Sequence, residues 1–414
     1  MVEGDDREKK RLRAESLRLI LLFGIISLLG DVIYEGARSV NGPYLDALQV
    51  NSAAVVGIVA GAGEFLGYGL RLASGVLSDR TRSYWTFTLA GYGLLAAVPL
   101  MALSGIWQVA AFLIILERVG KAIRSPSRDT LVSRSTKQVG TGMAFALVEV
   151  LDQVGAVIGP LIFSAVFLIL GAGAGSVSGY QKGYATLAVP YVLLMLVLAY
   201  GYLSLRRPDR GGDPVPEGRQ PDRLSRTFWL YTAFAFFAAF GLVNFLLIGY
   251  HLRARSLAPD AWIPLFYAAA MLVDAGMALV VGKLYDRFKQ ARGSPGGGLR
   301  LLVVIPLLTA PVPFLAFSSS LALIAVAVVL WGAVMGAHET IMRAAIADLT
   351  STGKRGTGYG VFNAAYGMAM FGGSVLSGFL YDLSVPALVA VTLLTELASL
   401  PVFLMILRSN RAGG

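Results

Sequence analysis

A short polar signature, GVLSDR at residues 75–80, separates two long apolar runs, and it recurs as GKLYDR at residues 282–287. The copies begin at residues 75 and 282 of a 414-residue chain, so half the chain length separates them. A second motif is also repeated at a similar spacing: Gly-Thr-Gly occurs at residues 140–142 and at 356–358, each time at the start of a Gly-rich apolar run. Because solenoid repeats are far shorter, this period predicts a duplicated unit. Two like-oriented halves are a recurring architecture among membrane transporters.

The composition is that of a membrane protein. Hydrophobic residues make up 56% of the chain and charged residues 14%, and the mean hydropathy is +0.67. Ordinary soluble domains contain about 45–50% apolar and about 25% charged residues. We therefore expect a polytopic membrane protein in contact with the lipid bilayer.

Several function classes are disfavoured by composition. The net charge of +10 does not indicate nucleic-acid binding, because Lys and Arg cluster in connectors between apolar runs and no nucleic-acid-binding module pattern is present. The chain has no Cys and 2 His, which excludes disulfides and thiolate metal sites and leaves no Ser-His-Asp or His-rich catalytic constellation. No ATP-binding P-loop is present. We expect that the protein is not an enzyme and that it holds no cofactor or resident metal. The expected driving force is an ion gradient, with H⁺ as the first candidate ion.

Twelve apolar runs of about 20 residues are each long enough to cross a bilayer. They cover roughly residues 17–40, 53–75, 84–104, 106–123, 139–171, 184–205, 228–250, 261–284, 299–318, 321–346, 357–381 and 385–407. A Pro-rich polar connector separates the first six runs from the last six. The expected fold is an all-α membrane protein with an N-terminal six-helix half (residues 1–205), a cytoplasmic linker (206–226) and a C-terminal six-helix half (227–414).

The basic connectors predict the orientation. If the amino terminus is cytoplasmic, nearly all Lys- and Arg-rich connectors fall on the cytoplasmic side, as the positive-inside rule requires. The exceptions on the other side are Lys182 and the pair Arg253 and Arg255. We expect a multi-pass protein of the cell (plasma or inner) membrane with both termini in the cytoplasm. The first apolar run acts as its own insertion signal.

These motifs resemble those of the major facilitator superfamily, whose members have twelve helices in two parallel six-helix halves and work by alternating access. The family signature Gly-x-Leu-x-Asp-Arg-x-x-Arg follows the second helix, and here its last basic position is displaced or lost near Arg82. Both copies match it at their Gly, Asp and Arg positions, which are Gly75, Asp79, Arg80, Gly282, Asp286 and Arg287. The resemblance implies that these are gate residues: Asp79 at its helix end would accept from backbone N–H groups and an Arg of the other half. The two glycines would permit close helix approach.

Further motifs extend the resemblance over nearly the whole chain. Arg118 matches a fourth-helix signature, with Lys121 where the family often has Gln. Gly155, Gly159 and Pro160 match the fifth-helix signature that the family associates with antiporters. A narrower likeness, to a drug/proton-antiporter-like prokaryotic subgroup of unassigned substrate, rests on Asp31, Glu35, Glu64 and the stretch at residues 117–129. The resemblance implies transport and a monomer, without naming a substrate.

Ionisable groups inside the membrane are the candidates for function, because each costs about 2.5–3.5 kcal/mol to insert. Asp31 and Glu35 are spaced i, i+4 and share a helix face, although Glu35 can instead pair with Arg38 near the membrane rim. Glu64 is a candidate proton carrier, since burial favours the neutral form of a carboxyl group. Arg71 lies too far along the same helix to bond with it directly.

Other carboxylates give a second set of candidates for proton coupling. Glu149 and Asp152 can share a proton or hold a cation, or can pair with Arg118 or Lys121. In the second half, His338 and Glu339 form a further candidate proton site, and Glu339 can pair with Arg343. The candidates for the substrate cavity are Arg38, Arg71, Asn244, Asp274, Arg343, Asn363 and Tyr366. His251 is expected to be solvated at the outer boundary.

The expected function is secondary active transport, in which a small molecule leaves in exchange for protons. Two alternatives stay open. One is a divalent-cation exporter that uses carboxylate oxygens as ligands, from Asp31, Glu35, Glu64, Glu149 and Asp152. The other is a non-transporting membrane partner or sensor built on a transporter fold. The charge of the solute also stays open, because the carboxylates suit cationic or zwitterionic solutes whereas Arg71, Arg118, Lys121 and Arg343 suit anions.

Overall fold

The computed structural model describes the backbone of residues 2–134, 141–173, 175–205, 224–292, 295–350 and 355–412. Within these ranges every element of secondary structure is helical. Their side chains are described except at residues 2–15, 134, 141–146, 172, 205, 292, 295–296, 343, 347, 355 and 410–412. Most of the predicted linker, residues 206–223, therefore lies outside the described part of the chain.

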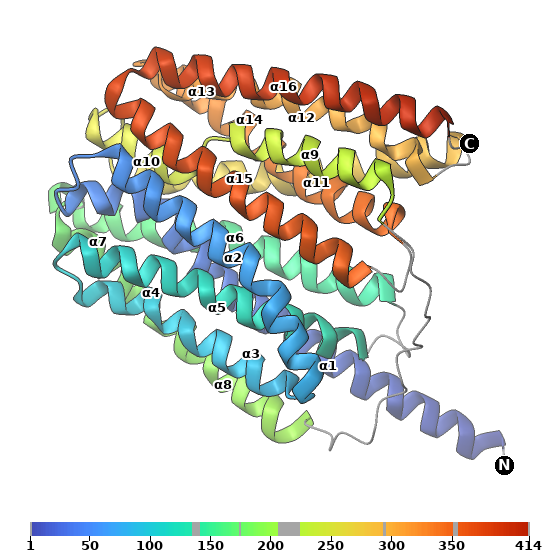
Figure 1. Ribbon diagram of the computed structural model, residues 1–414. Coiled ribbons are helices and arrows are strands. Elements are labelled where there is room, and N and C mark those ends of the chain that lie inside the picture. Colours follow the sequence, from blue (N-terminus) through green and yellow to red (C-terminus); the bar gives the residue numbers. More distant parts are fainter. Residues whose placement is uncertain are drawn as a thin grey trace.

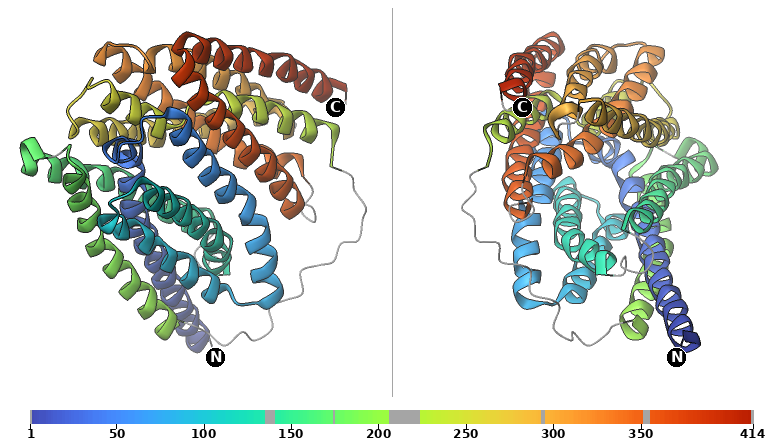
Figure 2. Two further views of the ribbon diagram at one scale, coloured as in Figure 1. Left: turned by 60° about the vertical axis from the view of Figure 1, so that its left-hand side comes forward. Right: turned by 90° about the vertical axis from the view of Figure 1, so that its right-hand side faces the viewer.

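The helices form two bundles that lie side by side (Figure 1). The first bundle contains α1 (Val2–Ala47), α2 (Ala53–Thr81), α3 (Tyr84–Gly93), η1 (Leu94–Ala96), α4 (Ala97–Leu100), η2 (Met101–Leu103), α5 (Trp107–Arg134), α6 (Thr141–Leu170), η4 (Gly171–Gly173), α7 (Val177–Thr186) and α8 (Ala188–Leu205). The second contains α9 (Arg226–Gly241), α10 (Phe245–Ala254), α11 (Trp262–Arg292), η5 (Pro295–Val303), α12 (Val304–Thr309), α13 (Val312–Ala316), α14 (Leu321–Leu349), α15 (Arg355–Leu383) and α16 (Val385–Ala412). The bundles meet where α2 packs along α15, α1 along α10, and α6 along α11 (Figures 1 and 2).

In the described part of the chain, ten helical stretches are long and apolar enough to cross a membrane. The other two expected spans correspond to α5 and α15, which have 28 and 29 residues and run through the bundles with the rest. They are more polar because α5 carries a charged series from Glu117 to Asp129 and α15 is rich in Gly, Ser and Tyr. Both helices line the central cavity described below, and part of each polar series faces that cavity.

Two pairs of helices touch backbone to backbone near one end of the molecule. A Cβ atom at Gly42 of α1 would lie 2.0 Å from the carbonyl oxygen of Leu246 in α10. A Cβ atom at Gly57 of α2 would lie 2.3 Å from the carbonyl oxygen of Ser374 in α15. Since real side chains do not approach this closely, only glycine permits these two contacts between the bundles.

The antiporter-type signature also has a packing role. A Cβ atom at Gly155 would lie 2.3 Å from the carbonyl oxygen of Leu28, and one at Gly159 would lie 2.2 Å from that of Val32. The signature therefore seats α6 directly on α1, at the level of Asp31.

One membrane-spanning stretch consists of two helices, α9 and α10, because the helix is interrupted at residues 242–244. Asn244 caps α10, because its side-chain oxygen accepts a hydrogen bond from the backbone N–H of Leu246 at 3.0 Å. The indole N–H of Trp331 donates to the Val243 carbonyl at 2.9 Å, which satisfies a backbone group freed by the break. Asn244 was expected in the substrate cavity, and the structure places it outside the cavity lining in this capping role.

Candidate functional site

A central cavity of about 960 Å³ lies between the two bundles. Helices α1, α2, α3, α5 and α6 supply one wall, and α11, α14 and α15 supply the other. The sequence-predicted candidates in the lining are Asp31, Glu35, Arg38, Glu64, Arg71, Gly75, Asp79, Arg118, Glu149, Asp152, Asp274, Glu339, Asn363 and Tyr366. The lining also includes Lys121, Arg124 and Arg128 of α5, which were not among the candidates for the substrate cavity.

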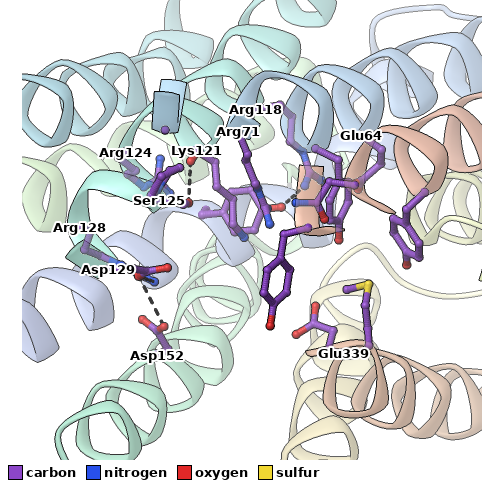
Figure 3. Close-up of a pocket in the computed structure, with 18 of the residues that line it drawn as sticks. Glu64, Arg71, Arg118, Lys121, Arg124, Ser125, Arg128, Asp129, Asp152 and Glu339 are labelled. Carbon is purple, nitrogen blue, oxygen red and sulfur yellow. Dashed lines mark hydrogen bonds and ion pairs between the residues drawn. The ribbon is translucent and has the colours of Figure 1, made fainter. Parts of the chain in front are cut away.

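Five buried charges form a continuous network across α1, α2 and α5. Figure 3 labels two of them, Glu64 and Arg118. Arg38 lies 3.7 Å from Glu35 Oε2 and 3.4 Å from Glu64 Oε1. Arg118 lies 3.3 Å from the same Glu64 Oε1 and 3.7 Å from Glu117 Oε2. Each of these five residues is less than a tenth exposed, at 4% to 9%. We call this set the Glu64 network.

A tyrosine from the opposite bundle joins the network. The hydroxyl of Tyr267 in α11 donates a hydrogen bond to Glu35 Oε2, and Arg118 donates one to the hydroxyl of Tyr34 in α1. Tyr267 is fully buried among aromatic side chains. The expected Glu35–Arg38 pair is therefore present, but it is buried in the cavity wall and shared with Glu64 and Tyr267, instead of standing alone at the membrane rim.

A second cluster surrounds Arg128. Its guanidinium lies 3.0 Å from Asp129 and 3.8 Å from Asp152 (Figure 3). It also donates a hydrogen bond to the Ser27 hydroxyl at 2.9 Å. Pairing with Arg118 or Lys121 was one alternative for Glu149 and Asp152, but Asp152 lies beside Arg128, and Arg118 is engaged in the Glu64 network. Arg128, which is closer to the carboxyl end of α5, is the residue that pairs with Asp152.

Three further cations of this wall lie over tyrosine rings. The charged group is 4.6 Å from the ring centroid for Arg71 over Tyr68, 3.7 Å for Lys121 over Tyr34, and 4.8 Å for Arg124 over Tyr92. No carboxylate of a described residue lies within ion-pair distance, 4.0 Å, of these three groups. Cation–π contact stabilises a cation while leaving its N–H donors available.

The opposite wall carries fewer charges. Asp274 of α11 is 8% exposed and faces the cavity among Met271, Met335 and Met342. Glu339 of α14 also lines the cavity. His338 is 3% exposed, lies outside the lining, and has no hydrogen-bond partner for either ring nitrogen among the described residues. The side chain of Arg343 lies outside the described part of the structure.

One end of the cavity is closed by polar contacts between the bundles. Asp382 of α15 accepts hydrogen bonds at the amino end of α2, from the Ser52 hydroxyl at 2.8 Å and the backbone N–H groups of Ala53 and Ala54 at 2.9 and 3.0 Å. Next to it, the Tyr250 hydroxyl donates to the carbonyl of Val50 at 3.1 Å.

An ion-pair cluster completes this closed end. Arg253 of the second bundle lies 3.0 Å from Asp46 of α1 and also pairs with Asp260, which accepts a hydrogen bond from Tyr180 of α7. His251, which we expected to be solvated, is 4% exposed, and one of its ring nitrogens lies 2.7 Å from the Tyr381 hydroxyl. Its ring packs against Phe317 and Tyr381, which accounts for its burial.

The opposite end carries the two sequence signatures, and they are not latched to each other. Asp79 accepts a hydrogen bond from the Tyr84 hydroxyl of its own bundle at 3.0 Å. Asp286 and Arg287 are exposed, and among the described side chains no hydrogen bond or ion pair joins the two signatures. The expected close approach at Gly75 is also absent, because a Cβ there would meet its nearest neighbour, in Pro126, at an ordinary 3.5 Å. The same holds at Gly282, with Thr340 at 3.6 Å.

An all-helical membrane protein with a charged cavity between two bundles, closed at one end by contacts between them, has the architecture of a secondary transporter. The chain belongs to the Major Facilitator Superfamily, whose family pattern it matches over residues 27–314. It is therefore a multi-pass membrane transporter, and the fold predicted from the sequence is confirmed.

Relatives cover almost all of the chain. An uncharacterized protein of Mycobacterium bovis is 39% identical over 389 residues, which are 92% of this chain and 91% of the relative. An uncharacterized MFS-type transporter of Methanocaldococcus jannaschii is 25% identical over 379 residues, 88% of this chain and 89% of the relative.

Solved structures share the fold at low sequence identity. The nucleoside transporter NupG has a TM-score of 0.68 and 13% identity, and the likeness covers 94% of this chain and 98% of that one. A bacterial homolog of the human lysosomal transporter Spinster, in an inward-facing and unoccupied conformation, has a TM-score of 0.62 and 16% identity, with 95% of each chain covered.

Proposed function

We propose that this transporter exchanges protons for a small molecule by alternating access and exports that molecule. The observation that carries the proposal is the unequal number of charges in the Glu64 network. Three carboxylates share two guanidinium groups, Arg38 and Arg118. A buried charge without a partner is costly, so the network is most stable when one of its carboxyl groups holds a proton.

Glu35 links the proton to the conformation of the protein. Its carboxylate accepts the hydrogen bond of Tyr267, so the contact joins α1 of one bundle to α11 of the other. Hydrogen bonds to an ionised acceptor are about twice as strong as neutral ones. Gain of a proton at Glu35 therefore weakens the contact between bundles, and loss of the proton strengthens it. Glu64, which bridges both guanidinium groups, distributes the change through the network.

Antiport and export are supported by the signature at Gly155, Gly159 and Pro160, which the family associates with antiporters and which packs against the acidic part of α1. We further propose a monomer in the cell membrane with both termini in the cytoplasm, driven by an ion gradient without a cofactor. In that orientation the unlatched end of the cavity faces the cytoplasm, from which an exporter loads its solute.

A divalent-cation exporter is the weaker proposal. Its carboxylate ligands would have to converge, whereas Glu35 and Glu64 face arginines and Asp152 faces Arg128. Among the residues whose placement is described, no three His, Cys, Asp or Glu residues are grouped so that they would hold a metal ion. A non-transporting sensor would not need a solvated cavity of this size.

The test uses purified protein in sealed liposomes that contain a pH-sensitive dye. Cationic drugs, organic anions, zwitterions, and Mn²⁺ or Fe²⁺ are added in turn, and Glu35→Gln, Glu64→Gln and Asp31→Asn are compared with the unmodified protein. We expect solute-dependent proton movement that is lost in Glu35→Gln or Glu64→Gln.

The matched control is Glu396→Gln, which removes a buried carboxyl group of α16 that lies outside the cavity lining. This variant is expected to retain proton movement. Solute flux without proton movement in the unmodified protein would refute proton coupling, and movement of Mn²⁺ or Fe²⁺ alone would favour the metal exporter.

A further inference from the structure

The ion pairs of the cavity wall leave a defined set of charges for a solute. Arg38, Arg118 and Arg128 are all bound to carboxylates. Among the described side chains of the lining, the cations that remain are Arg71, Lys121 and Arg124, which belong to α2 and α5 of the first bundle. Figure 3 shows them on the same side of the pocket, with Glu339 of the second bundle across from them.

The three cations are built into the wall and still have unused donors. Each is held by a tyrosine ring, which supports the charge from one face without accepting its N–H groups in a conventional hydrogen bond. Arg71 Nε and Arg124 Nη1 are buried and have no hydrogen-bond partner among the described residues. Leaving a buried donor unsatisfied costs free energy, so an anionic group that accepts these bonds would be favoured here.

Nearby carboxylates neutralise the charge of Arg71, Lys121 and Arg124 only in part. Asp31 is close enough to attract Lys121 and Arg124, and Glu117 attracts the same two cations. Neither makes an ion pair with them within 4.0 Å in the described structure. Glu117 Oε2 is already engaged with Arg118 at 3.7 Å. Attraction at longer range therefore helps to hold the cations in place without using their N–H donors in ion pairs with described carboxylates.

The cavity wall formed by the second bundle carries an acidic group at Asp274. Asp274 makes no hydrogen bond or ion pair with a described residue, and its nearest charged neighbours are mainly other carboxylates, Glu339, Glu35 and Glu149. Arg38 is the one attracting cation among those neighbours, and it is already shared between Glu35 and Glu64. A cationic group of a solute would therefore be stabilised beside Asp274, among the methionines that line this wall.

We propose that the solute is a zwitterion whose anionic group binds Arg71, Lys121 and Arg124 in the first bundle and whose cationic group binds Asp274 in the second. The inference rests on the proposed function and names its substrate class. It also supplies a reason for exchange, because a cation beside Asp274 repels a proton from the neighbouring Glu35. Solute and proton then disfavour each other, as antiport requires.

The test measures equilibrium binding to the detergent-solubilised full chain near neutral pH, by calorimetry and by thermal stabilisation. The probes are glycine, β-alanine, γ-aminobutyrate and ε-aminocaproate, whose charges lie at increasing separations. Each is compared with its N-acetyl derivative, which keeps only the anion, and with its carboxamide, which keeps only the cation. We expect one zwitterion to bind at least about tenfold more tightly than either singly charged derivative, since each lost charge-assisted bond costs about that factor.

Substitutions test the site for the anionic group and the site for the cationic group separately. Lys121→Gln should weaken the zwitterion and the N-acetyl anion about tenfold and leave the carboxamide unchanged, whereas Asp274→Asn should weaken the zwitterion and the carboxamide and leave the anion unchanged. Lys121→Arg should retain binding. The matched control is Lys182→Gln, which removes a lysine of α7 outside the cavity lining and should bind as the unmodified protein does.

Each outcome decides the proposal. Equal affinity for the zwitterion and one of its singly charged derivatives would overturn it, as would an Asp274→Asn variant with unchanged affinity for the zwitterion, or no binding of any probe in the series. Binding needs no gradient, so it is independent of proton coupling. A protein that prefers the zwitterion but moves no protons in liposomes would refute the proposed exchange and leave the substrate class standing.

Discussion

The two ends of the cavity are held together by different kinds of contact. At the closed end, the bundles meet through backbone contacts at Gly42 and Gly57 and through the side chains of Asp382 and Arg253. At the other end, Asp79 bonds within its own bundle, and Lys289 binds Asp348 at 2.7 Å within the second bundle. One end is therefore stabilised between the bundles and the other within each of them.

This difference shows how the molecule can favour one conformation without being fixed in it. The side-chain contacts that Asp382 and Arg253 make at the closed end are polar, so water can replace them when that end opens. At the other end, the signature residues have only local partners among the described side chains and are available for contacts between bundles in the opposite conformation. We expect substitutions at the closed end to shift the balance between conformations, and substitutions at the signature to act mainly on transport.

The largest effect is expected for Gly42→Ala. Its Cβ would overlap the Leu246 carbonyl oxygen, and a backbone atom cannot move away as a flexible side chain can. Overpacking of this kind costs about 1–3 kcal/mol, which changes the ratio of two conformations by about 5- to 150-fold. Because the chain has no Cys, spin labels can be attached at Lys182→Cys and Ser256→Cys, and the distance between them should lengthen.

The matched control for that substitution is Gly69→Ala, because a Cβ at Gly69 would meet nothing within 4 Å. It should leave the label distance unchanged. A Gly42→Ala protein with the same distance distribution as the unmodified protein would show that the closed end does not depend on this glycine.

A smaller shift is expected for Asp382→Ala. The substitution removes three hydrogen bonds at the amino end of α2, which Asp382 caps from the opposite bundle. Loss of a helix cap costs about 0.5–2 kcal/mol. The same pair of labels should report a partial opening, and Asp382→Asn, which keeps one acceptor oxygen, should open less. Equal opening in both variants would mean that the charge, and not the capping geometry, holds this end.

A weaker and salt-dependent effect is expected for Arg253→Gln. Its ion pairs with Asp46 and Asp260 are about a fifth exposed, so ions in solution screen them. Partly exposed pairs contribute about 1 kcal/mol or less. The opening caused by the substitution should be measurable at low ionic strength and should largely disappear near 1 M salt, where the screening length is about 3 Å. A change independent of salt would contradict this assignment.

The smallest effect on conformation is expected for Asp79→Asn. Among the described residues, the Asp79 carboxylate accepts one hydrogen bond, from the Tyr84 hydroxyl, which an amide oxygen can also accept. The label distance at the closed end should change little, whereas the transport rate in liposomes should fall because the latch of the opposite conformation loses its charge. A large shift in the label distance with normal transport would reverse the roles assigned to the two ends.

The sequence predicted the fold more completely than the site. Runs of apolar residues located the spans, and the two signatures indicated the duplication, because both depend on local pattern. Glu35 and Arg38 were paired correctly because they share a helix. The partners of Glu64 and Asp152 lie on neighbouring helices, whose rotation and depth a linear pattern does not contain. Tyr267 was missed because an aromatic residue in an apolar helix resembles any other packing residue.

In the proposed exchange of a zwitterion for a proton, the membrane voltage is part of the driving force. A zwitterion carries no net charge, so an exchange of one zwitterion for one proton moves one elementary charge across the membrane in each cycle. Every 100 mV of potential then contributes about 2.3 kcal/mol to transport, in addition to the difference in proton concentration. A cell that is negative inside would drive such export even when the pH is the same on both sides.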